Sequence, residues 1–135
     1  MRHFFFGLLV IAASTPAFAQ NFNIDVGNQP TYSPLPSAAC GAGAGQAGTW
    51  NGVSGLTTGP FALVDITGAA TAVTVSRTGP ASTFAADNAS TTGDDAALMD
   101  DGYDPGTATP WSTWTFSGLS DGNYRLFTYA WAPDS

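Results

Sequence analysis

The first twenty residues decide in which compartment the chain folds, and therefore which bonds can hold its fold together. A short polar start precedes an apolar run over residues 4–13, and Ala17-Phe18-Ala19 follows as a small-x-small sequence. This order is typical of a bacterial secretory signal peptide that is cleaved after Ala19. The apolar run is shorter than the ~20 residues of a membrane span. We therefore predict that residues 1–19 are removed and that residues 20–135 form a secreted or cell-surface domain without membrane insertion.

The mature chain must reach its stability by packing. Cys40 is its single cysteine, so an internal disulfide cannot form even in an oxidising compartment. The chain is nevertheless long enough to bury one core of ordinary size.

The charged residues exclude several classes of function. After cleavage the only basic side chains are Arg77 and Arg125, against ten aspartates, and no lysine, glutamate or histidine remains. Nucleic acids and anionic membranes require clustered basic side chains, so we expect neither as a partner. Without histidine, a Ser-His-Asp or Cys-His pair cannot be built, nor can a histidine zinc site. We therefore expect a protein that is not an enzyme.

Short apolar segments between glycine- and proline-rich stretches indicate an all-β fold. Alternating or apolar residues predict strands at 22–26, 61–66, 72–76, 113–116 and 123–131. Asn51-Gly52 predicts a turn, residues 29–48 and 77–93 read as loops, and Asp94–Asp101 is the one expected helix. This pattern predicts an antiparallel β-sandwich of jelly-roll type with one short helix.

The expected last strand, residues 123–131, carries apolar side chains on both faces, which is typical of a central strand. Phe127 and Tyr129 on this strand, like Trp114, are therefore expected in the core. The sequence stops at Ser135 with no following strand to pair with it. We therefore expect residues 20–135 to be a truncated sandwich, the N-terminal part of a longer protein.

Five short motifs occur in the same order in a group of exported bacterial domains. They are Asn23-Ile24-Asp25-Val26-Gly27, Trp50-Asn51-Gly52-Val53, the stretch 67–75, the stretch 97–103 and the stretch 118–124. In these motifs the chain resembles the galactose-binding-like, malectin-like and carbohydrate-binding-module jelly rolls of large bacterial surface proteins. The resemblance implies a jelly-roll fold. The family pattern usually continues through further strands to an Asn-Gly hairpin, which this sequence lacks.

A cluster of aspartates around the expected helix could bind calcium, which prefers six to eight oxygen ligands. Asp100, Asp101 and Asp104 are the candidate ligands, although the spacing is not that of an EF-hand. In the alternative interpretation, Asp94 and Asp95 cap the helix start and the other aspartates are solvated.

Aromatic side chains are the second group of candidates, because flat rings stack on the apolar faces of sugars. Tyr103, between aspartates, and Trp111, after a proline, are the expected exposed rings, and Trp131 is a third candidate if its covering sheet is missing. A glycosidase pair of carboxylates is a weaker hypothesis, because the acids lie in polar loops. We therefore expect a non-enzymatic binding or surface-display module for carbohydrate. The alternative is a structural spacer of a cell-surface or matrix protein with no small-molecule ligand.

Overall fold

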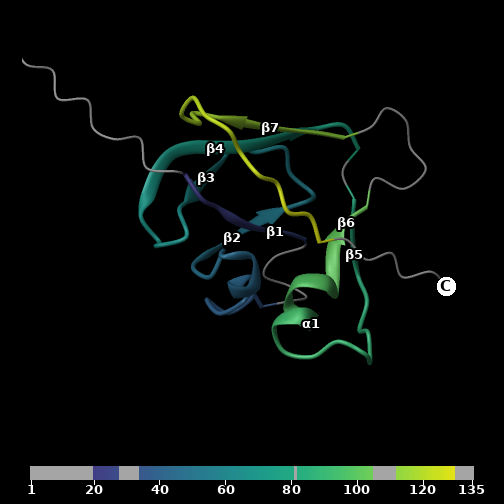
Figure 1. The fold of residues 1–135 in the computed structure, drawn as a ribbon. Helices are drawn as coiled ribbons and strands as arrows, with labels where there is room; N and C mark the ends of the chain where they lie inside the picture. The colour runs from purple at the N-terminus through teal and green to yellow at the C-terminus, as the bar shows by residue number, and fades with distance from the viewer. Residues whose placement is uncertain (1–19, 28–33, 81, 105–111, 130–135) are drawn as a thin grey trace, which may run out of the picture.

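The computed structural model describes residues 20–27, 34–80, 82–104 and 112–129, which form short strands and one α-helix (Figure 1). The predicted signal peptide, Trp111 and Trp131 lie outside these residues. Among the described residues, no helix combines the length and the hydropathy that crossing a membrane requires. The elements in chain order are β1 (Asn23–Gly27), the 3₁₀ helix η1 (Ala42–Ala44), β2 (Trp50–Ser54), β3 (Phe61–Val64), β4 (Ala70–Thr78), β5 (Thr83–Ala85), α1 (Asp94–Met99), β6 (Asp101–Tyr103) and β7 (Thr113–Ser117).

The strands form three small sheets. In the largest sheet, β4 lies between β3 and β7 and pairs with both in antiparallel register. β5 and β6 form a second antiparallel pair. The prediction of an all-β fold with antiparallel sheets and one short helix is confirmed. The pair β1–β2 differs from that prediction, because these two strands run parallel, with Asn23 opposite Trp50 and Gly27 opposite Ser54.

The core lies between the β1–β2 pair and the three-stranded sheet. Its centre consists of Val53, Leu63, Val73 and Val75, each at most 1% exposed. Val73 and Val75 lie two residues apart on β4, so they share one face of the sheet, as the alternation predicts. Around this centre pack the partly buried side chains of Phe22, Ile24, Val26, Phe61, Trp114 and Leu119.

The prediction of a turn at Asn51-Gly52 is wrong, because both residues lie inside β2. The reason is the side chain of Asn51, which is buried and used as a connector. Its Nδ2 donates to the carbonyl oxygens of Asn23 (3.0 Å) and Val64 (2.9 Å), and its Oδ1 accepts from the backbone N–H of Val64 (2.9 Å). One amide therefore joins β1, β2 and β3, and so connects two sheets.

The prediction of a strand over residues 123–131 is also wrong for its described part. Residues 123–129, called the aromatic segment from here on, form no strand and run along the surface from the end of β7 toward β6 (Figure 1). Apolar side chains on both faces are typical of a central strand, which pairs with a neighbouring strand along each edge. That position in the main sheet is taken by β4, whose two edges pair with β3 and β7.

The stretch 77–93 is likewise not all loop. Arg77 and Thr78 complete β4, and residues 83–85 form β5, which pairs with β6.

Replacing Asn51 tests whether one amide joins the sheets. Asn51→Ala leaves the N–H and C=O of Val64 and the C=O of Asn23 without this partner in a buried place. We expect the free energy of unfolding to fall by about 2–4 kcal/mol. Urea unfolding followed by tryptophan fluorescence measures it. The matched control is Asn123→Ala, at an exposed amide, with an expected change below about 0.5 kcal/mol. Equal effects of the two variants would contradict the connecting role.

Candidate functional site

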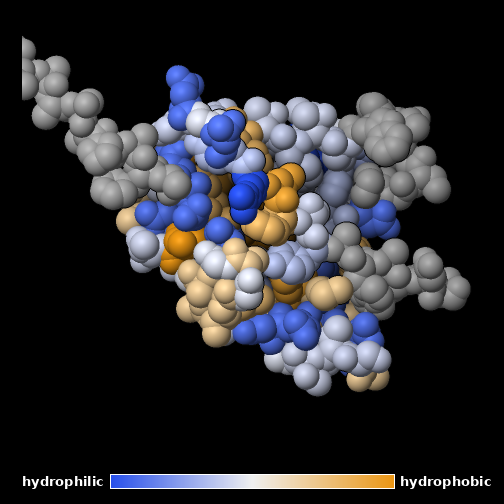
Figure 2. Space-filling model, in the orientation of Figure 1, coloured by the Kyte–Doolittle hydropathy of each residue, from blue (hydrophilic) through white to orange (hydrophobic). Residues whose placement is uncertain are grey.

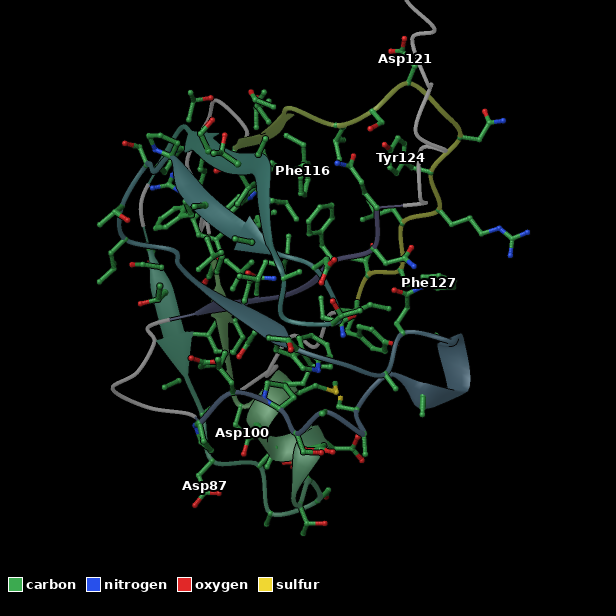
Figure 3. The ribbon with its side chains drawn as sticks, turned by 90° about the vertical axis from the view of Figure 1, so that its left-hand side faces the viewer. Asp87, Asp100, Phe116, Asp121, Tyr124 and Phe127 are labelled. Carbon is green, nitrogen blue, oxygen red and sulfur yellow. The ribbon has the colours of Figure 1, made fainter. Side chains whose placement is uncertain are left out.

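The aromatic segment carries most of the exposed large hydrophobic side chains of the described residues. Tyr124 is 48% exposed, Phe127 51% and Tyr129 52%, and Leu126 reaches 85%. Figure 3 shows Tyr124 and Phe127 on the same segment, which runs down one side of the molecule. The expectation that Phe127 and Tyr129 lie in the core is therefore wrong, whereas Trp114 does pack against the core.

Hydrogen bonds fix the start of the aromatic segment to the beginning of the described chain. The hydroxyl of Tyr124 lies 2.6 Å from the carbonyl oxygen of Ser120 and 3.3 Å from Oε1 of Gln20. The backbone N–H of Ser120 donates to the same Oε1 at 2.8 Å. The next residue, Asn21, accepts a backbone hydrogen bond from Ile66 at 3.1 Å. Tyr124 is therefore positioned by Ser120, four residues earlier, and by Gln20, 104 residues away in sequence.

Polar side chains alternate with the rings along this stretch. Asp121, Asn123 and Arg125 are all exposed, and Phe116 on the neighbouring β7 is 38% exposed. Figure 2 shows hydrophobic and hydrophilic atoms lying next to one another over the face that this segment crosses. Such a surface offers ring faces for stacking together with carboxylate, amide and guanidinium groups for hydrogen bonds.

Tyr103, a predicted sugar-stacking residue, occupies a different position from the one expected. Its half-buried ring meets Trp114 edge-on, with 5.7 Å between the ring centroids, and the guanidinium carbon of Arg77 lies 5.0 Å from its centroid. Its hydroxyl is hydrogen-bonded to the carbonyl oxygen of Pro80 and to Oγ of Ser112. The ring and the hydroxyl are thus used inside the fold. Trp111 and Trp131, the other two candidates, are outside the described residues.

Arg77, the partner of Tyr103, is a buried cation with an exposed fraction of 1%. Its Nη1 donates to the carbonyl oxygens of Gly79 (2.9 Å) and Pro80, and its Nη2 donates to that of Thr57 (3.4 Å). Carbonyl oxygens and the face of an aromatic ring can both solvate a guanidinium. Arg77 therefore ties the end of β4 to two loops and to β6.

The three predicted calcium ligands do not converge. Asp100 accepts a hydrogen bond from Oγ1 of Thr91 (2.7 Å), Asp101 is buried at 4% exposure, and Asp104 is exposed. Within residues 20–27, 34–80, 82–104 and 112–129, no three acidic, histidine or cysteine side chains are grouped as a metal site.

The side chain of Asp94 does not cap α1, in contrast to the alternative interpretation of the aspartates. The N-cap residue of α1 is Gly93, and no side chain caps the helix there. The carboxylate of Asp94 instead accepts hydrogen bonds from the N–H and the Oγ of Ser37, both at 2.7 Å. These two bonds lower the pKa of Asp94 and hold the loop before η1 against the helix.

A pair of buried carboxyl groups lies where β1 meets β6. Asp25 is 2% exposed and Asp101 4%. The carboxyl group of Asp101 has room because residue 27 is glycine, since a Cβ there would collide with it. Burial, followed by the negative charge of Asp101, raises the pKa of Asp25 to about 7. A glycosidase carboxylate has to reach a bound sugar, whereas both of these are enclosed by the fold.

Sequence reasoning missed this pair, because Asp25 lies on the polar side of an alternating strand. In the structure that side of β1, which carries Asn23, Asp25 and Gly27, is the buried one, while Ile24 and Val26 pack beside the core. Gly27, the last residue of β1, was the available signal of a close approach.

The chain matches no protein-family model, no curated protein and no solved structure. The resemblance to galactose-binding-like and malectin-like domains therefore stays a prediction from short motifs.

The carboxyl pair predicts an unusual dependence of stability on pH. The pKa of Asp25 is raised from 3.8 to about 7 on folding, so the folded state binds this proton more tightly. The resulting stability is fully present below about pH 4 and is lost as the pH rises through 7. Between pH 5 and pH 8 the free energy of unfolding should fall by about 2–3 kcal/mol from this group. Urea unfolding at several pH values measures the decline.

The neutral variant Asp25→Asn should flatten this decline and be more stable than the parent at pH 8. Asp121→Asn, which removes an exposed carboxyl, is the matched control and should keep the parent's slope. A slope that Asp25→Asn leaves unchanged would contradict the assignment.

Proposed function

We propose that this chain is an exported, non-enzymatic binding or surface-display module whose ligand class is carbohydrate. The observation that carries the proposal is the aromatic segment, with the rings of Tyr124, Phe127 and Tyr129 each about half exposed. Aromatic side chains contribute large contact areas, and a single exposed row of them is costly to keep in water without a partner.

The polar groups beside the rings suit a sugar better than an apolar ligand. Sugars present apolar C–H faces and a rim of hydroxyl groups. Asp121 can accept hydrogen bonds from hydroxyls, Arg125 can donate to them, and Asn123 can do both. The ligand-binding residues of this proposal are therefore Tyr124, Phe127 and Tyr129. Tyr103 is not among them, because its ring is already in contact with Arg77 and Trp114.

The proposal is tested by binding to a glycan array and to soluble polysaccharides in affinity gels. We expect retention by at least one glycan class, and a loss of about tenfold or more in affinity for Phe127→Ala and for Tyr129→Ala, corresponding to the ~1–2 kcal/mol of a lost stacking contact. Leu56→Ala, which truncates a side chain 49% exposed in the turn after β2, is the matched control and should bind like the parent.

Circular dichroism shows whether each variant is folded. A folded parent chain that no glycan retains would overturn the proposal in favour of a structural spacer. Equal losses in Phe127→Ala and Leu56→Ala would show that the aromatic segment is not the binding surface.

A further inference from the structure

Gln20, the expected first residue of the mature chain, has its side-chain carbonyl held by two groups from the other end of the described chain. Oε1 of Gln20 accepts from the backbone N–H of Ser120 at 2.8 Å, and the hydroxyl of Tyr124 lies 3.3 Å away. Gln20 is half-buried, and Asn21 beside it is fixed through the backbone N–H of Ile66. The amide of Gln20 is therefore held in a defined place, with the N–H of Ser120 donating to its oxygen and the hydroxyl of Tyr124 close by.

An N-terminal glutamine carries a reactive pair of groups. Its α-amine attacks Cδ of its own side chain, a bond forms between the α-nitrogen and Cδ, and the bond between Cδ and Nε2 breaks. The α-nitrogen gives up a proton, Nε2 gains one, and ammonia leaves. The product is the five-membered lactam pyroglutamate, and the reaction needs no oxidant, reductant or co-substrate.

Negative charge collects on Oε1 while Cδ is tetrahedral. Hydrogen-bond donors placed at such an oxygen lower the barrier, as in the oxyanion holes of acyl-transfer enzymes. The N–H of Ser120 is such a donor at its present distance. The phenol of Tyr124 has a single proton. In the structure it is donated to the carbonyl oxygen of Ser120 at 2.6 Å. As charge develops on Oε1, rotation of the hydroxyl brings that proton to it.

We propose that the fold promotes cyclisation of its own N-terminal Gln20 to pyroglutamate, with Ser120 N–H and the Tyr124 hydroxyl as the oxyanion donors. This inference rests on the export step of the proposed function, because a free α-amine at Gln20 requires cleavage after Ala19. The lactam keeps the same carbonyl oxygen as an acceptor for these donors. The modified chain has a blocked and uncharged N-terminus.

The rate of cyclisation is measured on the full chain with a site-specific protease sequence inserted between Ala19 and Gln20. Cleavage exposes the amine at a defined time, and intact-mass spectrometry follows the loss of one ammonia. We expect the folded chain to cyclise at least about tenfold faster than the same chain in urea, and Tyr124→Phe to be slower than the parent by about 3- to 10-fold. Thr128→Val removes an exposed hydroxyl of the aromatic segment and is the matched control, with an unchanged rate.

A folded chain that cyclises no faster than the unfolded one overturns the proposal, and this comparison decides it even if Tyr124→Phe does not fold. An equal rate in folded Tyr124→Phe and the parent removes Tyr124 from the mechanism and overturns it as stated. The mass of the product exported with the natural leader must show a chain beginning at residue 20, and any other start overturns it too. None of these readouts involves a glycan, so a failure here is distinguishable from a failure of carbohydrate binding.

Discussion

The amide of Asn51 is the connection on which the arrangement of the sheets depends. Three hydrogen bonds from one buried side chain hold β2 against β1 on one side and β3 on the other. This places Val53 of β2 opposite the main sheet, where Val73 and Val75 complete the core. The chain has one cysteine, and few apolar side chains are fully buried among the described residues. A polar connector of this kind adds stability that disulfides or a larger core supply in other proteins.

The buried polar side chains make their contacts with other parts of the fold. Arg77 and Tyr103 tie the end of β4 to loops and to β6, and Asp25 and Asp101 fill the junction of β1 and β6. Groups committed in this way are not free to meet a ligand. Among the described residues, the aromatic segment carries most of the exposed large hydrophobic side chains, with polar groups beside them.

The sequence predicted the positions of strands and of the helix better than the contacts that their residues make. Alternation located β1, β4 and β7, and the acidic start located α1, because these signals are local. The helix ends earlier than predicted, at Met99, because Asp101 already belongs to β6. Where prediction failed, contacts between residues distant in the sequence determined the structure. Asn51-Gly52 has turn chemistry, yet Asn51 finds Val64 and Asn23 across the sheet. The rings of the aromatic segment look like core residues, but no described strand pairs with them. Burial of Asp25 depends on β6, which is more than seventy residues away.

The central claim is that the aromatic segment lies unpaired on the surface with its rings available. Amide hydrogen exchange followed by NMR on the full chain tests it most directly. The account predicts that the amides of residues 123–129 exchange fast, near the rates of unstructured peptide, while those of β4 between its two partner strands are strongly protected. Protection of residues 123–129 equal to that of β4 would show a paired, buried strand, and would contradict both the surface position of the rings and the binding function proposed for them.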